Sequence, residues 1–221
     1  MLSRRSFLAA LAGIALAPRT VLAALKRVDL ICRPAWRARK PRREDFATHR
    51  VRRLTVHHSA VKLTDNREAP AHFRSHQASH MAKGWPDIAY HVLVDRGGNV
   101  YRGRPWRFKG DTATNYDPAG HFLVMCEGNF EDQRPSGAQL AALADVLAWA
   151  SERFGVKPGR IGGHRDYAST SCPGRHLHEH VESGKLRRMV RRRLRSGGVK
   201  LAGLCGPEGK QRVADIEAGL G

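Results

Sequence analysis

The most restrictive feature of this sequence is an uninterrupted apolar run at residues 122–126, followed closely by a well-marked amphipathic helix. A run with no polar residue is typical of a strand that is buried on both faces. Ser136 can cap the helix, and Gln139, three residues later, suits a capping box. The apolar stripe over residues 140–154 predicts that the helix ends before Gly155. A buried strand covered by a helix indicates a layered α/β fold.

Shorter patterns extend this arrangement along the chain. They predict a strand at 51–56, a helix at 66–81, a hairpin at 88–101 that turns at Gly97-Gly98, and a last helix at 177–194. Strands and helices therefore alternate around a hairpin. We expect an α/β fold with a mixed central β-sheet flanked by helices, rather than a strictly parallel, doubly wound sheet.

The first residues differ in character from the rest of the chain. Arg4-Arg5 precede an apolar run at 9–17, and the small residue Ala23 follows. This pattern is typical of a twin-arginine export signal, because the apolar run is too short to remain as a membrane-spanning helix. We expect a signal peptide at 1–23, one domain at 24–195, and a basic, Gly-rich tail at 196–221 with a short helix near 211–218. The mature protein is then periplasmic or secreted, monomeric, and not stably inserted in a membrane.

The charge of the chain predicts an acidic partner. There are 39 Lys and Arg against 20 Asp and Glu, which gives a net charge of +19, and loss of residues 1–23 leaves +16. Nucleic acid would suit this charge, but no groove-reading motif or aromatic platform is recognisable. An exported protein instead meets the carboxylates and anionic polymers of the bacterial cell wall. The basic residues at 185–200 surround an apolar stripe, so they are mainly the outer face of a packed helix; docking to anionic wall polymers is the functional alternative.

Three residues form a candidate zinc site. His164 and Cys172 stand eight residues apart in a loop that ends in Pro173-Gly174, and His57 lies at the end of the strand at 51–56. Catalytic zinc commonly takes three protein ligands and leaves one position open for water. On spacing alone, the same residues would equally suit two histidines in a polar network and a buried thiol.

Several motifs together resemble those of the type-2 N-acetylmuramoyl-L-alanine amidase and peptidoglycan recognition protein superfamily. They cover roughly residues 30–190 in the expected order, at 31–36, 57–58, 80–91, 95–105, 127–130 and 164–174. The resemblance implies an amidase-like mixed α/β fold and zinc bound by His57, His164 and Cys172. It also implies peptidoglycan as the partner and hydrolysis of the amide between the lactyl group of N-acetylmuramic acid and L-alanine.

The resemblance further assigns catalytic roles to Tyr90 and Thr170, whose hydroxyl groups would support the oxyanion of the transition state. The acid that protonates the leaving amine is not identified. Met125 stands where some relatives carry a catalytic glutamate, and His58 and Tyr90 are weaker candidates for that role. Arg102 occupies a place that is commonly acidic, and the segment 110–113 replaces a frequent His-Ala-Gly segment, so the substrate details differ.

Two other groups of histidines suggest metal binding at first sight. His72, His76 and His80 recur every four residues, but three ligands on one helix would be spread along its axis. We therefore expect them to face the surface or a groove. Residues 176, 178 and 180 are also histidines, and we expect them to form a solvated helix face.

The four cysteines leave one pairing open. Cys172 is a predicted metal ligand and Cys126 lies in the buried strand. Cys32 and Cys205 can form a disulfide bond in an exported protein, or one of them can remain a free thiol.

A peptidoglycan-binding module without catalysis is the alternative function. Members of the superfamily that keep the groove but not the metal typically lack the cysteine of the loop. Because Cys172 and Tyr90 are both present, the sequence favours catalysis.

Overall fold

The computed structural model describes residues 25–220, and the predicted signal peptide at 1–23 lies outside this range. Seven strands form one sheet in the order β6-β2-β5-β3-β4-β1-β7. β6 (Ile161–Gly163), β2 (Arg53–His58), β5 (His121–Cys126) and β3 (Val92–Val94) are parallel to one another. β4 (Val100–Arg102) pairs antiparallel with β3, and β1 (Lys26–Ile31) and β7 (Val199–Leu204) continue parallel to β4. The expectation of a mixed α/β sheet is confirmed.

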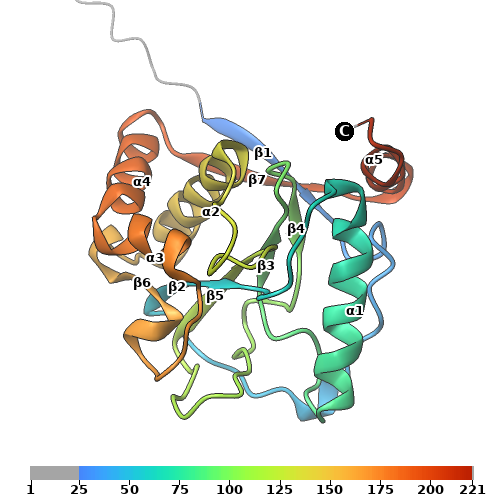
Figure 1. Cartoon of the computed structure of the whole chain (residues 1–221), viewed down its shortest axis with the longest axis horizontal. Coiled ribbons are helices and arrows are strands. Elements are labelled where there is room, and N and C mark those ends of the chain that lie inside the picture. Colours follow the sequence, from blue (N-terminus) through green and yellow to red (C-terminus); the bar gives the residue numbers. More distant parts are fainter. Residues whose placement is uncertain (1–24, 221) are drawn as a thin grey trace, which may run out of the picture.

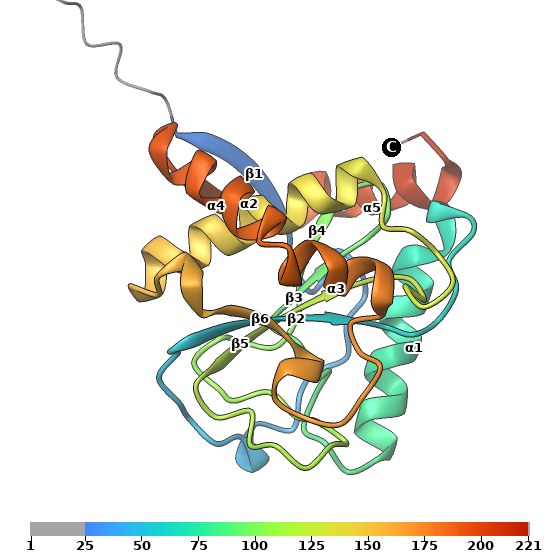
Figure 2. The same cartoon turned by 60° about the vertical axis from the view of Figure 1, so that its left-hand side comes forward.

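Helices cover both faces of the sheet (Figure 1). One face carries α2 (Gly137–Phe154), α3 (Arg175–Glu182) and α4 (Lys185–Arg195), which pack on the larger apolar cluster of the core. The other face carries α1 (Ala69–Ala82) and α5 (Gly206–Ala218), which pack on a second cluster around Trp36 and Phe73. Figure 2 shows the same separation of α1 from α2, α3 and α4. Short 3₁₀ turns lie at Arg43–Asp45, Asn66–Glu68, Pro158–Arg160 and His164–Asp166.

The central strand and its covering helix form as predicted. Every residue of β5 is buried. The Ser136 hydroxyl accepts a hydrogen bond from the backbone N–H of Gln139 at 2.9 Å, and α2 ends at Gly155 in the left-handed conformation. The capping box is only half formed, because the side-chain oxygen of Gln139 does not accept from the Ser136 backbone N–H, while the Gln139 amide donates to the carbonyls of Val94 and Glu127.

The predicted helix at 177–194 is two helices. α3 ends at Glu182, and α4 begins at Lys185 after Gly184, whose φ of 70° lies in the left-handed region. The two segments still bury one shared stripe, made of Leu177, Val181, Leu186 and Val190. The apolar spacing continues across Gly184, so the sequence pattern did not predict the break.

The expectation of a tail at 196–221 is wrong for the residues that the structure describes, although the short helix predicted near 211–218 does form, as part of a longer helix. Residues 199–204 form β7, which pairs with β1 from Lys26 to Ile31, and residues 206–218 form α5. A disulfide bond joins Cys32 to Cys205, with 5.0 Å between their Cα atoms. The glycine content suggested loose chain, whereas pairing with a strand more than 170 residues away determines the structure.

Within residues 25–220, no helix is both long and apolar enough to cross a membrane.

Candidate metal centre

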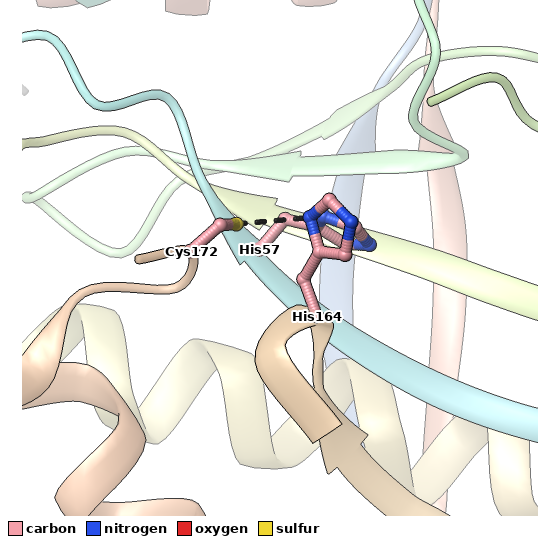
Figure 3. Close-up of side chains that lie close together, drawn as sticks. All are labelled: His57, His164 and Cys172. Carbon is pink, nitrogen blue, oxygen red and sulfur yellow. Dashed lines mark hydrogen bonds between the residues drawn. The ribbon is translucent and has the colours of Figure 1, made fainter. Parts of the chain in front are cut away.

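The three predicted ligands converge on one point at the carboxyl ends of β2 and β6 (Figure 3). His57 is the fifth residue of β2 and pairs in register with Met125 of β5. His164 follows β6 directly, and Cys172 lies in the loop before α3. One ligand atom from each residue lies within 4.8 Å of the other two.

The distance between two of these atoms suits a zinc site. The Sγ atom of Cys172 lies 3.6 Å from Nδ1 of His57. With Zn–S near 2.3 Å and Zn–N near 2.0–2.1 Å, tetrahedral coordination places the sulfur and the nitrogen about 3.6 Å apart. The other ring nitrogen of His57, Nε2, is buried and has no hydrogen-bond partner among the described residues. The donor set and its spacing therefore fit a zinc ion.

Burial prepares the three groups differently for ligation. It lowers the pKa of His164 to about 4, and burial together with the His164 imidazole holds the pKa of His57 well below its usual range. Both rings are thus neutral donors at neutral pH, as metal ligation requires. Burial raises the pKa of the Cys172 thiol to about 12, against a lowering by the backbone N–H of His58. A bound cation would favour the thiolate form of Cys172.

A network of hydrogen bonds closes the ligand loop. The backbone N–H of Arg165 donates to the Cys172 carbonyl at 2.8 Å, and Asp166 accepts from the N–H of Gly163 at 2.8 Å. Asp166 is also bonded to His178, which therefore braces this loop and is not part of a solvated face. Gly174 has a φ of 85°, and a Cβ atom there would lie 2.4 Å from the Phe130 backbone, so only glycine permits this exit from the loop.

Tyr90 lies beside the predicted ligands, with its ring centroid 5.2 Å from that of His57. Burial, followed by the charge of Cys172, raises the pKa of the Tyr90 hydroxyl above its usual range. The phenol is therefore a hydrogen-bond donor at neutral pH. Thr170 lies next to the thiol ligand, and its Oγ1 accepts a hydrogen bond from the backbone N–H of Cys172 at 3.2 Å.

Two residues at the site were not predicted from the sequence. Thr114 bonds to Nε2 of His164 at 2.8 Å, which leaves Nδ1 of that ring to face the other ligands. The Tyr116 ring packs on the His164 ring at 5.1 Å between centroids, and its buried hydroxyl has no partner among the described residues. Both belong to the segment between β4 and β5, which has no periodic pattern, so only the fold brings them to the site.

The other candidates have different surroundings. Met125 is fully buried in the apolar cluster against α1. His58 accepts a hydrogen bond at Nδ1 from the backbone N–H of Phe130, and burial lowers its pKa to about 4. His72 and His76 are not simple surface residues, because both contact the buried carboxylate of Glu127. His80 packs among aromatic rings, with its ring centroid 4.7 Å from that of Trp85 and 5.7 Å from that of Tyr90.

Comparison with known proteins agrees with this site. Residues 47–175, more than half of the chain, match the N-acetylmuramoyl-L-alanine amidase family. The chain belongs to the type-2 amidase and peptidoglycan recognition protein superfamily. The matched residues include His57, His164 and Cys172 together with Tyr90 and Thr170.

Individual relatives extend this similarity. Peptidoglycan-recognition protein SC2 of Drosophila melanogaster is 30% identical over 159 residues, which are 71% of this chain and 86% of that protein. The structure of peptidoglycan recognition protein LE in complex with tracheal cytotoxin has a TM-score of 0.63 at 27% identity, covering 70% of this chain and 92% of that one. The amidase LysC from Clostridium intestinale has the same fold, with a TM-score of 0.56 at 21% identity over 74% of this chain and 98% of that one.

Proposed function

We propose that this chain is an exported, zinc-dependent N-acetylmuramoyl-L-alanine amidase. The observation that carries the proposal is the convergence of His57, His164 and Cys172 beside the Tyr90 phenol, in a chain of the amidase family. The reaction adds water across the lactyl–L-alanine amide. The C–N bond breaks, the hydroxyl group goes to the carbonyl carbon, and a proton goes to the leaving amine.

The metal would supply the Lewis acidity of the site, polarising the scissile carbonyl and bringing the pKa of a water molecule toward neutrality. The protein holds that centre through two imidazoles that remain neutral and one thiol. Thr114 orients His164 through its Nε2 atom. Closure of the loop by the Arg165–Cys172 backbone hydrogen bond keeps the sulfur next to the two rings.

Three hydroxyl groups are available to support the developing oxyanion. Tyr90 remains protonated and lies next to His57, so its O–H can donate. The Thr170 hydroxyl accepts from the Cys172 N–H, and its own hydrogen is free to donate to substrate. The unpartnered hydroxyl of Tyr116 adds a third donor on the His164 side of the site.

His58 does not suit the role of proton donor to the leaving amine. Its Nδ1 is an acceptor for the Phe130 N–H, and its lowered pKa keeps the ring neutral near pH 7. The raised pKa of Tyr90 suits a hydrogen-bond donor and not an acid that gives up its proton, so neither of the two candidates suggested by the sequence is proposed as the acid.

The cellular setting that we propose is the periplasm or the outside of the cell, reached through the twin-arginine signal. The Cys32–Cys205 disulfide supports this location, because such bonds persist mainly in oxidising compartments. The exposed arginines of α4, which include Arg188, Arg191, Arg192 and Arg195, support attachment to the acidic cell wall.

The alternative function is peptidoglycan binding without catalysis. It is favoured by relatives that are named as recognition proteins and by the structure of one of them with tracheal cytotoxin. One experiment separates the two functions. The mature chain is incubated with purified peptidoglycan, with and without a chelator, and the products are identified by mass spectrometry. Chelator-sensitive release of peptides with a free L-alanine amino terminus is expected. Binding without release, in protein that carries zinc, would establish the recognition function instead.

A further inference from the structure

A second cluster of side chains that can ligate a metal shares no residue with the proposed zinc site. His72 and His76 stand one turn apart on α1, and Glu127 is the first residue after β5. Nδ1 of His72 lies 2.8 Å from one carboxylate oxygen of Glu127, and Nε2 of His76 lies 2.9 Å from the other. One ligand atom from each of the three residues lies within 4.8 Å of the other two. We refer to these residues as the His72–Glu127–His76 cluster.

The carboxylate at the centre of the cluster is fixed and dry. Glu127 has no exposed surface, its backbone N–H donates to the Val94 carbonyl, and its own carbonyl accepts from Gln139. Among the described residues, the two imidazoles are its only side-chain partners. Hydrogen bonds from these rings hold the pKa of Glu127 below its usual range despite burial, and Glu127 raises the pKa of His72. A buried anion of this kind needs a cation in contact with it, and either a protonated His72 or a bound metal ion can supply it.

The donor set of the cluster suits a metal ion as that cation; the 2.8 and 2.9 Å contacts are hydrogen-bond distances, and a bound ion would lengthen them to about 3.4 Å. Two histidines at i and i+4 on one helix, joined by a carboxylate from another element, form a donor set that is typical of zinc. Two histidines one turn apart on a helix would not by themselves indicate a metal site. His176 and His180 have the same spacing on α3, but no buried carboxylate is bonded to them among the described residues. The side chains of His72 and His76 are 23% and 16% exposed, so an ion has a path from solvent and water can complete its coordination.

We propose that His72, His76 and Glu127 form a second binding site for a divalent metal ion of the zinc type, which fastens α1 to the end of β5. A dication would satisfy the buried carboxylate while both imidazoles remain neutral ligands. The site has no cysteine, so its chemistry differs from that of the Cys172 centre.

The position of the site suggests what it stabilises. One turn after His76, His80 packs against Tyr90, and its Nδ1 accepts a hydrogen bond from the backbone N–H of Ala89. A metal ion that ties α1 to the sheet would therefore brace the helix that supports the Tyr90 segment. The proposed role is structural, and the ion takes no part in the reaction.

Metal stoichiometry tests the proposal. Purified protein is equilibrated with Zn²⁺, freed of excess metal by gel filtration, and measured by mass spectrometry of the elements. We expect two zinc ions per chain in the native protein, one in Cys172→Ser, one in His76→Ala, and none in the double variant. His176→Ala is the matched control and should retain two. One zinc in the native protein and none in Cys172→Ser would overturn the proposal, and it would leave the proposed amidase function intact.

Cobalt distinguishes the two sites by their spectra. Co²⁺ at the Cys172 centre has a sulfur-to-metal charge-transfer band, which a site of nitrogen and oxygen ligands lacks. In Cys172→Ser, Co²⁺ should still give the weaker visible bands of a bound ion, and these should disappear in Cys172→Ser with Glu127→Gln. Glu127→Gln preserves the shape of the side chain but removes its negative charge. Circular dichroism and thermal unfolding of this variant without metal show whether it folds. If that variant does not fold, His72→Gln with Cys172→Ser provides the same comparison at a partly exposed position. Visible bands that persist in either folded variant would contradict the assignment.

Discussion

The sulfur of Cys172 lies 3.6 Å from Nδ1 of His57, although 115 positions separate the two residues in the chain. Burial raises the pKa of the thiol while it lowers that of the imidazole. A thiol whose pKa is raised transfers its proton poorly to an imidazole whose pKa is lowered, so this pair is a poor arrangement for nucleophilic catalysis by cysteine. It is a good arrangement for two ligands that share a cation.

Cys172→Ser should therefore remove most of the zinc of this centre while preserving the fold. A hydroxyl group is a much weaker zinc ligand than a thiolate, and the site would fall from three good ligands to two. Amidase activity should fall with the zinc content, whereas some affinity for peptidoglycan should remain. Zinc per chain, product release and binding to peptidoglycan are measured on the same preparation. Full activity with full zinc content would mean that the metal centre is misplaced.

Tyr90→Phe should lose activity without losing zinc. The hydroxyl of Tyr90 is assigned to the transition state and not to the metal, so zinc should be retained while kcat falls by a factor corresponding to about 2–4 kcal/mol. Tyr116→Phe is the companion variant, because the Tyr116 ring also packs beside the ligands and its hydroxyl has no hydrogen-bond partner within residues 25–220. A loss of zinc in Tyr90→Phe would show that the hydroxyl acts on the metal centre itself.

Thr114→Val should weaken metal binding without removing a ligand. With Nδ1 of His164 as the ligand atom, Nε2 carries the hydrogen and donates to Thr114, which fixes the orientation of the ring. Loss of such a partner typically lowers metal affinity about 10–100-fold. Thr114→Ser, which keeps the hydroxyl, is the control and should bind the metal like the native protein; Thr112→Val is unsuitable, because the Thr112 hydroxyl is bonded to that of Thr114 at 2.8 Å. Competition with a chromophoric chelator gives both affinities, and equal values for the two variants would refute this role of Thr114.

The sequence predicts an element well when residues close to it in the chain determine that element, and poorly when distant residues do. β5 and α2 are predictable, because an apolar run and a Ser136 cap are local signals that the fold preserves. β7 is not, because a short strand rich in small residues becomes ordered only through its pairing with β1. Gly184 divides α3 from α4 without interrupting the apolar stripe, so that break was missed as well.

The same distinction applies to the site. Motifs place the three ligands, Tyr90 and Thr170 in the chain, and the fold brings the ligands together. Thr114 and Tyr116 come from an irregular segment that carries no sequence signal. The spacing of His72 and His76 was visible, but a carboxylate reaching them from a distant strand was not, since that contact exists only in the folded chain.

The buried histidines should make the protein less stable in mild acid. His91 has no exposed surface, its Nδ1 accepts from the Leu123 N–H, and its Nε2 donates to the Phe108 carbonyl, each at 2.8 Å. Burial lowers the pKa of His91 to about 3. The unfolded chain binds this proton below a pH of about 6.5 and the folded protein does not.

The free energy of unfolding should therefore be independent of this group above pH 6.5 and should fall as the pH drops from 6.5 toward 3. The slope is at most about 1.4 kcal/mol per pH unit for each such group. His91→Gln, which cannot be protonated, should be less stable at pH 7 and should have a shallower slope. Urea unfolding at pH 7, 6 and 5 in the presence of a chelator measures the free energy of unfolding of both proteins. If its dependence on pH is the same in the variant, groups other than His91 cause the loss of stability in acid.

The basic face of α4 should make attachment to cell walls sensitive to salt. Arg188, Arg191 and Arg195 are exposed at spacings that place them on one side of the helix, whereas Arg193 is bonded to the buried Asp145. The screening length shrinks from about 10 Å at 0.1 M salt to about 3 Å at 1 M, so binding through these residues should weaken sharply over that range. Replacing all three with Gln should reduce sedimentation with purified walls at low salt and flatten the salt dependence.

A matched variant separates a docking face from net charge. Replacement of the exposed residues Arg52, Lys62 and Lys210 with Gln removes the same charge from other parts of the surface. If α4 is the docking face, this control should bind walls almost as the native protein does, and only the α4 variant should lose affinity. Equal losses in both variants would show that the excess positive charge acts as a whole. Binding that is the same at low and high salt would show instead that contacts with the peptidoglycan itself dominate, and that the arginines of α4 serve only to keep the protein soluble.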